Sequence, residues 1–112
     1  MLERDIERYL CDEVKKLGGI AYKFTSPGHR SVPDRVCALP WGVVYFVECK
    51  RPGKKPTQLQ QREMDRLNQL GCRTRYVDSK PAVDALITEM KTEIHLWEEF
   101  FKGDEDDDTA TA

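Results

Sequence analysis

The residues of this chain whose types and spacing best suit a chemical role are two carboxylates and an amine: Asp34, Glu48 and Lys50. Glu48 and Lys50 are two positions apart, so on a strand their side chains point to the same face. Two carboxylates brought close together are hard to keep ionised unless a cation lies between them. A hard divalent ion such as Mg²⁺ or Mn²⁺ prefers oxygen ligands and suits such a pair. The chemistry to expect is therefore metal-ion binding, with an ammonium group beside the metal.

A β-hairpin would bring the two acids together. The segments on either side of a Pro-Trp-Gly turn at residues 40–42 are apolar and rich in β-branched and aromatic side chains, as strands are. If the turn is centred on Trp41, Asp34 pairs with Glu48 on the same face, with Cβ atoms about 5 Å apart. A bulge would shift the pairing by one residue, so the pattern predicts proximity rather than contact.

The spacing of Pro33-Asp34 and Glu48-x-Lys50, with thirteen residues between the acids, resembles the PD-(D/E)xK nuclease signature. In that signature the two acids hold the metal ion and the lysine positions the attacking water. Phosphodiester hydrolysis of this kind needs a Lewis acid, an activated water and positive charge near the transition state. A chance hairpin with a surface Glu-Lys pair is the alternative that this short motif leaves open.

Composition indicates one globular domain. The chain has 112 residues, of which 39% are hydrophobic and 34% charged. No apolar run is long enough to cross a membrane, and charges occupy the N-terminal positions where a signal peptide would be apolar. We therefore expect a cytoplasmic protein with no membrane partner. Its four cysteines lack metal-site spacing, which favours reduced thiols.

The charge is unevenly distributed along the chain. The net charge is −2, but five acids lie within residues 104–108, so the remainder is mildly basic and compatible with nucleic acid. We expect a single domain over residues 1–101 and an acidic, disordered tail over residues 102–112.

Hydrophobic periodicity and turn signals predict an α/β fold with the order αβββαβα and a mixed sheet flanked by helices. The last strand should run parallel to the second strand of the hairpin, through a right-handed helical crossover. The expected helices cover residues 2–17, 57–70 and 82–99, and the expected strands cover residues 20–24, 35–39, 43–47 and 73–77. This order resembles the core of restriction-endonuclease-like folds.

Longer motifs give a more specific resemblance. They are Glu3-x-x-x-Glu7-x-x-Leu10, Gly18-Gly19, residues 22–28, Val32-Pro33-Asp34-Arg35, Phe46-Val47-Glu48-x-Lys50, Pro52-Gly53, and Gln60 with Leu67 and Gly71. Together, over roughly residues 1–90, they resemble the VRR-NUC (virus-type replication-repair nuclease) family in its small stand-alone form. That resemblance implies a Mg²⁺- or Mn²⁺-dependent endonuclease that acts on branched DNA, similar to a Holliday-junction resolvase working as a homodimer.

The resemblance also implies roles for individual residues. Asp34, Glu48 and the Cys49 carbonyl oxygen would bind the metal, and Lys50 would orient the water. Glu7 would be the acid contributed by the first helix, with Glu3 as the alternative. Gln60 would support the site through its amide, although the spacing Thr57-x-x-Gln60 is that of a capping box and by itself favours a cap.

Two polar loops beside the acids are candidates for holding phosphates, with solvated connectors as the alternative. The candidate DNA-binding residues are Lys23, Ser26, His29, Arg30 and Arg35 around the first loop, and Arg51, Lys54 and Lys55 in the second. At the end of the last helix, Leu96-Trp97 and Phe100-Phe101 are more apolar than a small core needs. This end favours docking of a second subunit, with ordinary core packing as the alternative.

Three functions compete. The first is the metal-dependent endonuclease that cuts branched DNA as a homodimer. The second is a monomeric nickase, or a nuclease that trims flaps or ends. The third is a DNA-binding accessory protein that keeps the fold without catalysis.

Overall fold

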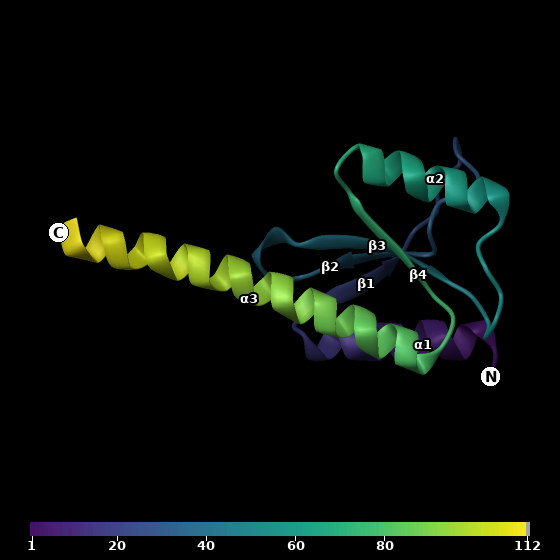
Figure 1. Cartoon of the computed structure of the whole chain (residues 1–112), viewed down its shortest axis with the longest axis horizontal. Coiled ribbons are helices and arrows are strands. Elements are labelled where there is room, and N and C mark those ends of the chain that lie inside the picture. The colour runs from purple at the N-terminus through teal and green to yellow at the C-terminus, as the bar shows by residue number, and fades with distance from the viewer. Residues whose placement is uncertain (112) are drawn as a thin grey trace.

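The computed structural model describes the backbone of residues 1–111 and the side chains of residues 1–103 (Figure 1). Its elements are α1 (Glu3–Lys16), β1 (Ile20–Lys23), β2 (Arg35–Ala38), the 3-10 turn η1 (Pro40–Gly42), β3 (Val44–Cys49), α2 (Gln58–Gln69), β4 (Arg73–Val77) and α3 (Lys80–Thr111). The expected order αβββαβα is confirmed, with η1 as the turn of the hairpin.

The four strands form one mixed sheet in the order β1-β2-β3-β4, antiparallel except for the parallel pair β3–β4. Helices α1 and α3 lie along one face of this sheet, whereas α2 lies on the opposite face (Figure 1). The sheet therefore has an α1/α3 face and an α2 face. Successive side chains of each strand belong alternately to these two faces.

The hairpin has the register that its sequence predicts. Arg35 pairs with Val47 and Ala38 pairs with Val44, so the pairing is centred on Trp41. Trp41 itself has a φ of 65°, a left-handed conformation that is uncommon for a bulky residue. Its indole stacks on the ring of Phe101 in α3, with centroids 5.1 Å apart. This packing against α3 supports the unusual turn that fixes the register.

The core lies between the α1/α3 face and its two helices. Ile6, Leu10 and Val14 form the fully buried stripe of α1, at the helical spacing expected from the sequence. They belong to one apolar cluster with Cys37, Tyr45, Val47 and Cys49 of the sheet and Val83, Leu86 and Met90 of α3. Burial of each such aliphatic side chain contributes about 1.5–3 kcal/mol, so this layer holds the sheet in place.

Helix α3 begins as expected and ends later. The Ser79 hydroxyl caps it by accepting a hydrogen bond of 3.1 Å from the Ala82 amide. The sequence predicted an end near Glu99, but the helix runs to Thr111 and extends past the sheet (Figure 1). The side chains of residues 104–112 lie outside the described part of the structure, so the disorder expected for residues 102–112 stays a prediction. None of the described helices is both long and apolar enough to span a bilayer.

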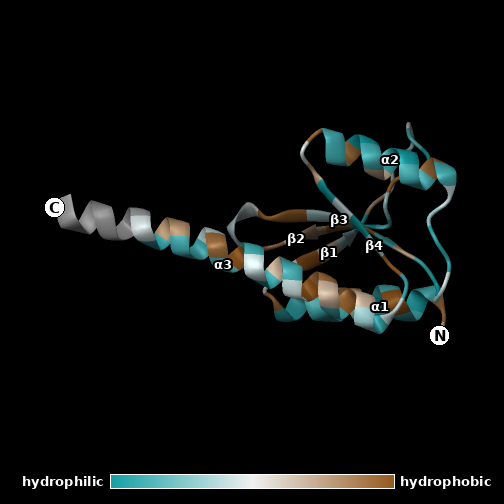
Figure 2. Cartoon of the chain, viewed as in Figure 1, coloured by the Kyte–Doolittle hydropathy of each residue, from teal (hydrophilic) through white to brown (hydrophobic). Residues whose placement is uncertain are grey.

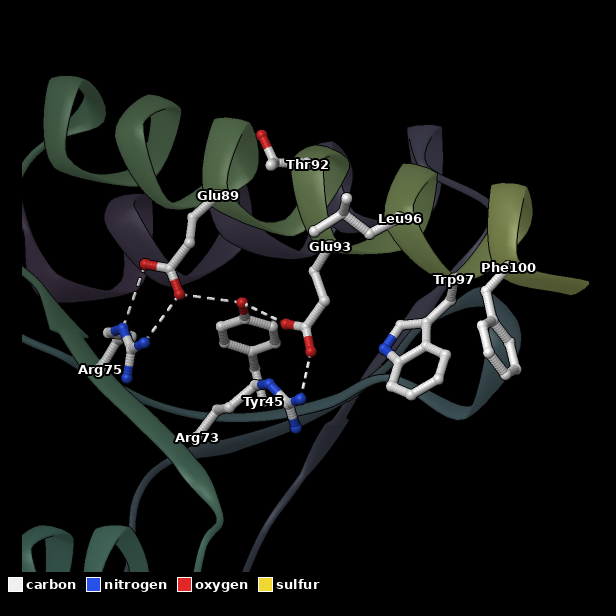
Figure 3. A pocket seen from close by; sticks show the side chains of 9 residues that line it. All are labelled: Tyr45, Arg73, Arg75, Glu89, Thr92, Glu93, Leu96, Trp97 and Phe100. Atoms are coloured by element: carbon white, nitrogen blue, oxygen red, sulfur yellow. Dashed lines mark hydrogen bonds and ion pairs between the residues drawn. The ribbon is translucent and has the colours of Figure 1, made fainter.

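A polar network fastens α3 to the edge of the sheet (Figure 3). The Tyr45 hydroxyl lies 2.8 Å from a carboxylate oxygen of both Glu89 and Glu93. Arg75 binds Glu89 through two nitrogens, at 3.1 and 2.7 Å, and Arg73 forms an ion pair with Glu93. Burial, followed by the two carboxylates, raises the pKa of Tyr45, so the phenol stays protonated and acts as a donor. The α1/α3 face is thus devoted to holding the fold together.

Gly19 lies where α1 meets the hairpin and leaves no room for a side chain. A Cβ at this position would lie 2.7 Å from both the Ala38 carbonyl oxygen and a Leu39 methyl group. We expect Gly19→Ala to lower the free energy of unfolding by about 1–3 kcal/mol, because backbone must move to relieve the overlap. Gly28→Ala is the control, since nothing lies within 4 Å of its Cβ position. Urea denaturation of the two variants checks this, and equal stability would contradict the close packing.

Candidate active site

The hairpin brings the two predicted acids together on the α2 face of the sheet. Asp34 precedes β2 and Glu48 lies near the end of β3, and the two carboxyl groups are close enough for Asp34 to raise the pKa of Glu48. Asp34 is fixed further by the Cys49 amide, which donates a hydrogen bond of 2.8 Å to its Oδ2. Because that amide belongs to β3, the orientation of Asp34 follows directly from the strand pairing.

Glu48 is a deeply buried carboxyl group with an unsatisfied oxygen. Glu48 is only 2% exposed, and its Oε2 atom has no hydrogen-bond partner among the described residues. Burial raises its pKa from 4.5 to about 9, and the hydrogen bond and charge of Asp34 act in the same direction, against a smaller opposing effect of Lys50. Such a buried oxygen is costly in a metal-free protein unless a cation or donor completes its environment.

The acid pair fits a divalent cation. Asp34 and Glu48 offer carboxylate oxygens, the donor type that Mg²⁺ and Mn²⁺ prefer, and the orphaned Glu48 oxygen is the atom that such an ion would satisfy. Within the described residues no cluster of three or more His, Cys, Asp and Glu side chains is arranged to hold a metal. Any further ligands would therefore come from backbone oxygen, such as the Cys49 carbonyl, from water or from a substrate.

Lys50 lies two residues beyond Glu48 and is 7% exposed. Its amide donates a hydrogen bond of 2.9 Å to the Val77 carbonyl oxygen, so the backbone still follows β4 at this point. Strand alternation places the Lys50 side chain on the same face as Glu48. The charge of Lys50 acts on Glu48 by opposing the rise of its pKa, and the expected role of Lys50 in orienting a water stays a prediction.

Glu7 lies on the other face of the sheet from the acid pair. Its carboxylate accepts hydrogen bonds from Arg35 Nε at 2.7 Å and from Lys23 Nζ at 3.1 Å. Arg35 and Lys23 are paired in the β1–β2 ladder and point to the α1/α3 face. All three residues are thus engaged with one another, although the Lys23 side chain is still 59% exposed. The DNA-binding roles expected for Lys23 and Arg35 stay predictions.

Glu3, the alternative to Glu7, lies at the start of α1 and is exposed. Its charge makes a small contribution to the raised pKa of Glu48. Which of Glu3 and Glu7 is the acid that α1 contributes to the site stays a prediction. The sequence could not decide between them, because the two residues are one helical turn apart on the same side of α1.

Gln60 forms the capping box that its spacing predicted. The Gln60 side-chain oxygen accepts a hydrogen bond of 2.9 Å from the backbone amide of Thr57. The backbone amide of Gln60 donates one of 3.2 Å to the Thr57 hydroxyl. One helical turn further on, Met64 lies against β4, where its carbonyl oxygen accepts from the Thr74 hydroxyl. Gln60 is therefore on the sheet-facing side of α2, with its side-chain oxygen already used by the cap.

The two candidate DNA-binding loops lie at the end of the sheet where β2 begins and β3 ends, which is also the end that carries the acids. In the first, His29 and Arg30 are exposed and Ser26 is partly buried. In the second, the side chains of Arg51, Lys54 and Lys55 are all exposed, while the Gly53 amide anchors the loop by donating to Asp78 at 3.3 Å. Both loops are attached to strands at the end of the sheet where Asp34 and Glu48 lie, so their exposed cations belong to that end of the molecule.

Sequence reasoning missed Tyr76, the neighbour of Glu48 on β4. The parallel register pairs Glu48 with Tyr76, so both side chains belong to the α2 face. Tyr76 is 39% exposed. The sequence indicates that β4 lies beside β3, because a helical crossover joins them. The length of that crossover does not determine which residue of β4 pairs with Glu48, so Tyr76 could not be found from the sequence.

A hairpin with paired acids in an αβββαβα fold is the arrangement that the sequence motifs associate with nucleases, and comparisons with known proteins agree with that class. "Putative nuclease p44" of Acyrthosiphon pisum secondary endosymbiont phage 1 is 58% identical over 78 residues, which are 70% of this chain and 84% of that protein. A solved structure described as a VRR_NUC domain matches with a TM-score of 0.73 and 34% identity, over 77% of this chain and 94% of its own. A comparison with models of protein families finds no match. The chain belongs to the VRR-NUC family of nucleases.

The burial of Glu48 predicts a pH-dependent cost to stability. Because its folded-state pKa of about 9 lies above 4.5, the folded metal-free protein holds a proton that the unfolded chain releases. The free energy of unfolding therefore falls as the pH rises from about 4.5 to about 9. Glu48→Gln removes this proton exchange, so we expect the variant to be about 1–3 kcal/mol more stable at pH 8 in EDTA.

Urea denaturation in EDTA at pH 5 and pH 8 measures the effect of Glu48→Gln. The difference between variant and wild type should shrink at pH 5, where the unfolded carboxyl is itself largely protonated. Glu99→Gln is the matched control, because Glu99 is more than half exposed and its replacement should change little at either pH. A less stable Glu48→Gln variant at pH 8 would contradict the described environment of this carboxyl.

Proposed function

We propose that this protein is a divalent-metal-dependent endodeoxyribonuclease that cuts branched DNA as a homodimer. The observation that carries the proposal is the buried Glu48 carboxyl, whose Oε2 has no partner among the described residues and which contacts Asp34. A protein that kept only the fold would gain stability by losing this carboxyl. Its presence beside Asp34 and Lys50 supports a catalytic role over the non-catalytic accessory protein.

Each residue of the site has a distinct task in phosphodiester hydrolysis. Asp34 and Glu48 would hold the ion, which supplies Lewis-acid chemistry when it is bound. Asp34 keeps its orientation because the Cys49 amide holds it at 2.8 Å. The Lys50 ammonium, fixed on the same face, would orient the attacking water and provide positive charge near the phosphate. Glu3 or Glu7 would complete the acidic side of the site from α1.

DNA is the proposed substrate because two loops with exposed cations border the acids. Arg30 lies in one loop, and Arg51, Lys54 and Lys55 lie in the other, all with exposed side chains. Such cations bind phosphates without regard to sequence, which suits an enzyme that selects DNA by its shape. Branched DNA, with a four-way junction as the favoured form, follows from the resemblance to stand-alone VRR-NUC nucleases.

The cleavage assay has clear expectations. Wild-type protein with Mg²⁺ or Mn²⁺ should cut a labelled four-way junction, and EDTA should stop the reaction. Asp34→Asn, Glu48→Gln and Lys50→Ala should each lower the cleavage rate by at least about a hundredfold, since each removes a group that acts in the transition state. Their affinity for the junction should change little.

Asp65→Asn, on the exposed side of α2, is the control and should cut normally. Cleavage by all three site variants would contradict the site assignment. Tight junction binding without any metal-dependent turnover of the wild type would favour the accessory protein. A preference for flaps, ends or linear duplex over junctions would favour the second nuclease class.

An exposed aromatic surface supports the proposed homodimer. We define it as Leu96, Trp97, Phe100 and Phe101 of α3 with Trp41 of η1. These residues are 64%, 39%, 56%, 37% and 44% exposed. The apolar band continues along α3 beyond the sheet (Figure 2), and a hollow of about 690 Å³ lies beside it, with Tyr45 and Trp97 among the residues that line it (Figure 3).

The size and charge of the aromatic surface fit a second copy of the chain. Its exposed apolar area is on the order of 400–500 Å², so two copies would bury about 1,000 Å², near the lower limit of a stable interface. Glu98 and Glu99 lie on the same helix beside the surface, and their charge disfavours DNA there. A ridge of side chains next to a hollow suits two-fold pairing, in which each copy fills the other's hollow.

The double variant Trp97→Ser with Phe100→Ser should shift the protein from dimer to monomer at micromolar concentration, because it removes the centre of the aromatic surface. Light scattering coupled to size-exclusion chromatography measures the mass. Leu59→Ser on α2 replaces an equally exposed apolar residue (59%) outside the surface and should leave the dimer intact. A monomeric wild type would favour the monomeric nickase, and a dimeric double variant would place the interface elsewhere.

A further inference from the structure

Tyr76 shares one row of the sheet with the acid pair. The β3–β4 register pairs it with Glu48, and across β3 from it lies Asp34, which contacts Glu48 from the β2 side. Neighbouring strands are about 4.8 Å apart, so the backbone of Tyr76 directly adjoins that of Glu48. Glu48 therefore has a second acid on one side and a phenol on the other.

The Tyr76 hydroxyl differs from two other tyrosine hydroxyls in its hydrogen bonding. Those of Tyr9 and Tyr45 are bound by carboxylates of α3. Within the described residues the Tyr76 hydroxyl makes no such contact, and the residue is 39% exposed although it adjoins a carboxyl group that is 2% exposed. The exposed Tyr76 side chain therefore starts from the strand position next to Glu48 and is accessible to a substrate.

We propose that the Tyr76 hydroxyl donates a hydrogen bond to a phosphate oxygen of the DNA strand bound at the acid pair. The inference rests on the proposed function and adds a substrate-contacting residue to it. Lys50 and Tyr76 flank Glu48, one along β3 and one across to β4, so the two donors approach a bound strand from different directions. A neutral donor suits this place because it orients a phosphate without competing for the carboxylates as a second ammonium would.

The proposed contact depends on the place where the substrate would bind. A metal ion held by Asp34 and Glu48 would bring the scissile phosphate to this row of the sheet. The long Tyr76 side chain starts from the neighbouring strand position, so its hydroxyl is a candidate donor to that phosphate or to the next one. A hydrogen bond from a neutral donor to a charged phosphate is strong enough to change the rate by about ten- to a hundredfold.

Tyr76→Phe tests the proposal, because it removes the hydroxyl and keeps the ring. We expect the single-turnover cleavage rate or the junction affinity to fall by about ten- to a hundredfold, with an unchanged thermal unfolding midpoint since no internal bond is lost. Tyr22→Phe is the matched control. Tyr22 is 55% exposed on the same sheet face but on the opposite edge strand, and its loss of a hydroxyl should change neither quantity.

A substrate with a neutral methylphosphonate at each phosphate near the cut separates direct contact from a structural effect. At one position wild type and Tyr76→Phe should become equal, because the contacted charge is gone, and a merely structural role would leave their ratio constant at all positions. Full activity of Tyr76→Phe would overturn the inference and leave the proposed function intact. The same holds if Tyr76→Ala is impaired while Tyr76→Phe is fully active, because the ring and not the hydroxyl would then matter. A wild type that neither cuts nor binds junctions would overturn both.

Discussion

The structure depends on one costly placement: a carboxyl group buried against a second carboxyl group. Glu48 is 2% exposed, its Oε2 is without a partner in the described residues, and its pKa rises to about 9. In a core selected only for stability an apolar residue would be better here. The rest of the domain can be understood as the scaffold that tolerates this position and the elements that bring other groups to it.

The two faces of the sheet divide these tasks. The α1/α3 face carries the apolar cluster, the Tyr45 network and the pairing of Glu7 with Arg35 and Lys23, all of which stabilise the fold. The α2 face carries Asp34, Glu48, Lys50 and Tyr76, which do little for it. Because strand side chains alternate, successive residues of β3 and of its neighbouring strands serve opposite faces. Stability and chemistry are therefore encoded in one stretch of sequence but are physically separate.

The sequence was sufficient for the parts that depend on local rules. The hairpin register followed from a turn centred on Trp41, and the cap at Gln60 followed from its spacing to Thr57. What it could not supply depends on contacts between distant segments. Glu3 and Glu7 lie one turn apart on the same side of α1, so only the packing of α1 against the sheet can distinguish them. Tyr76 becomes the neighbour of Glu48 through a parallel register that depends on the crossover. The helical extension past Glu99 also went unpredicted, because the acidic run at residues 104–108 has no apolar periodicity to indicate a helix.

The measurement that tests this account most directly is anomalous diffraction from crystals of the wild-type protein grown with Mn²⁺ and no DNA. The account predicts an anomalous peak between the Asp34 and Glu48 carboxylates, on the α2 face of the sheet, and its loss in crystals of Glu48→Gln. Occupied manganese sites elsewhere, with none at this pair, would contradict the claim that the buried carboxyl exists to hold a metal ion.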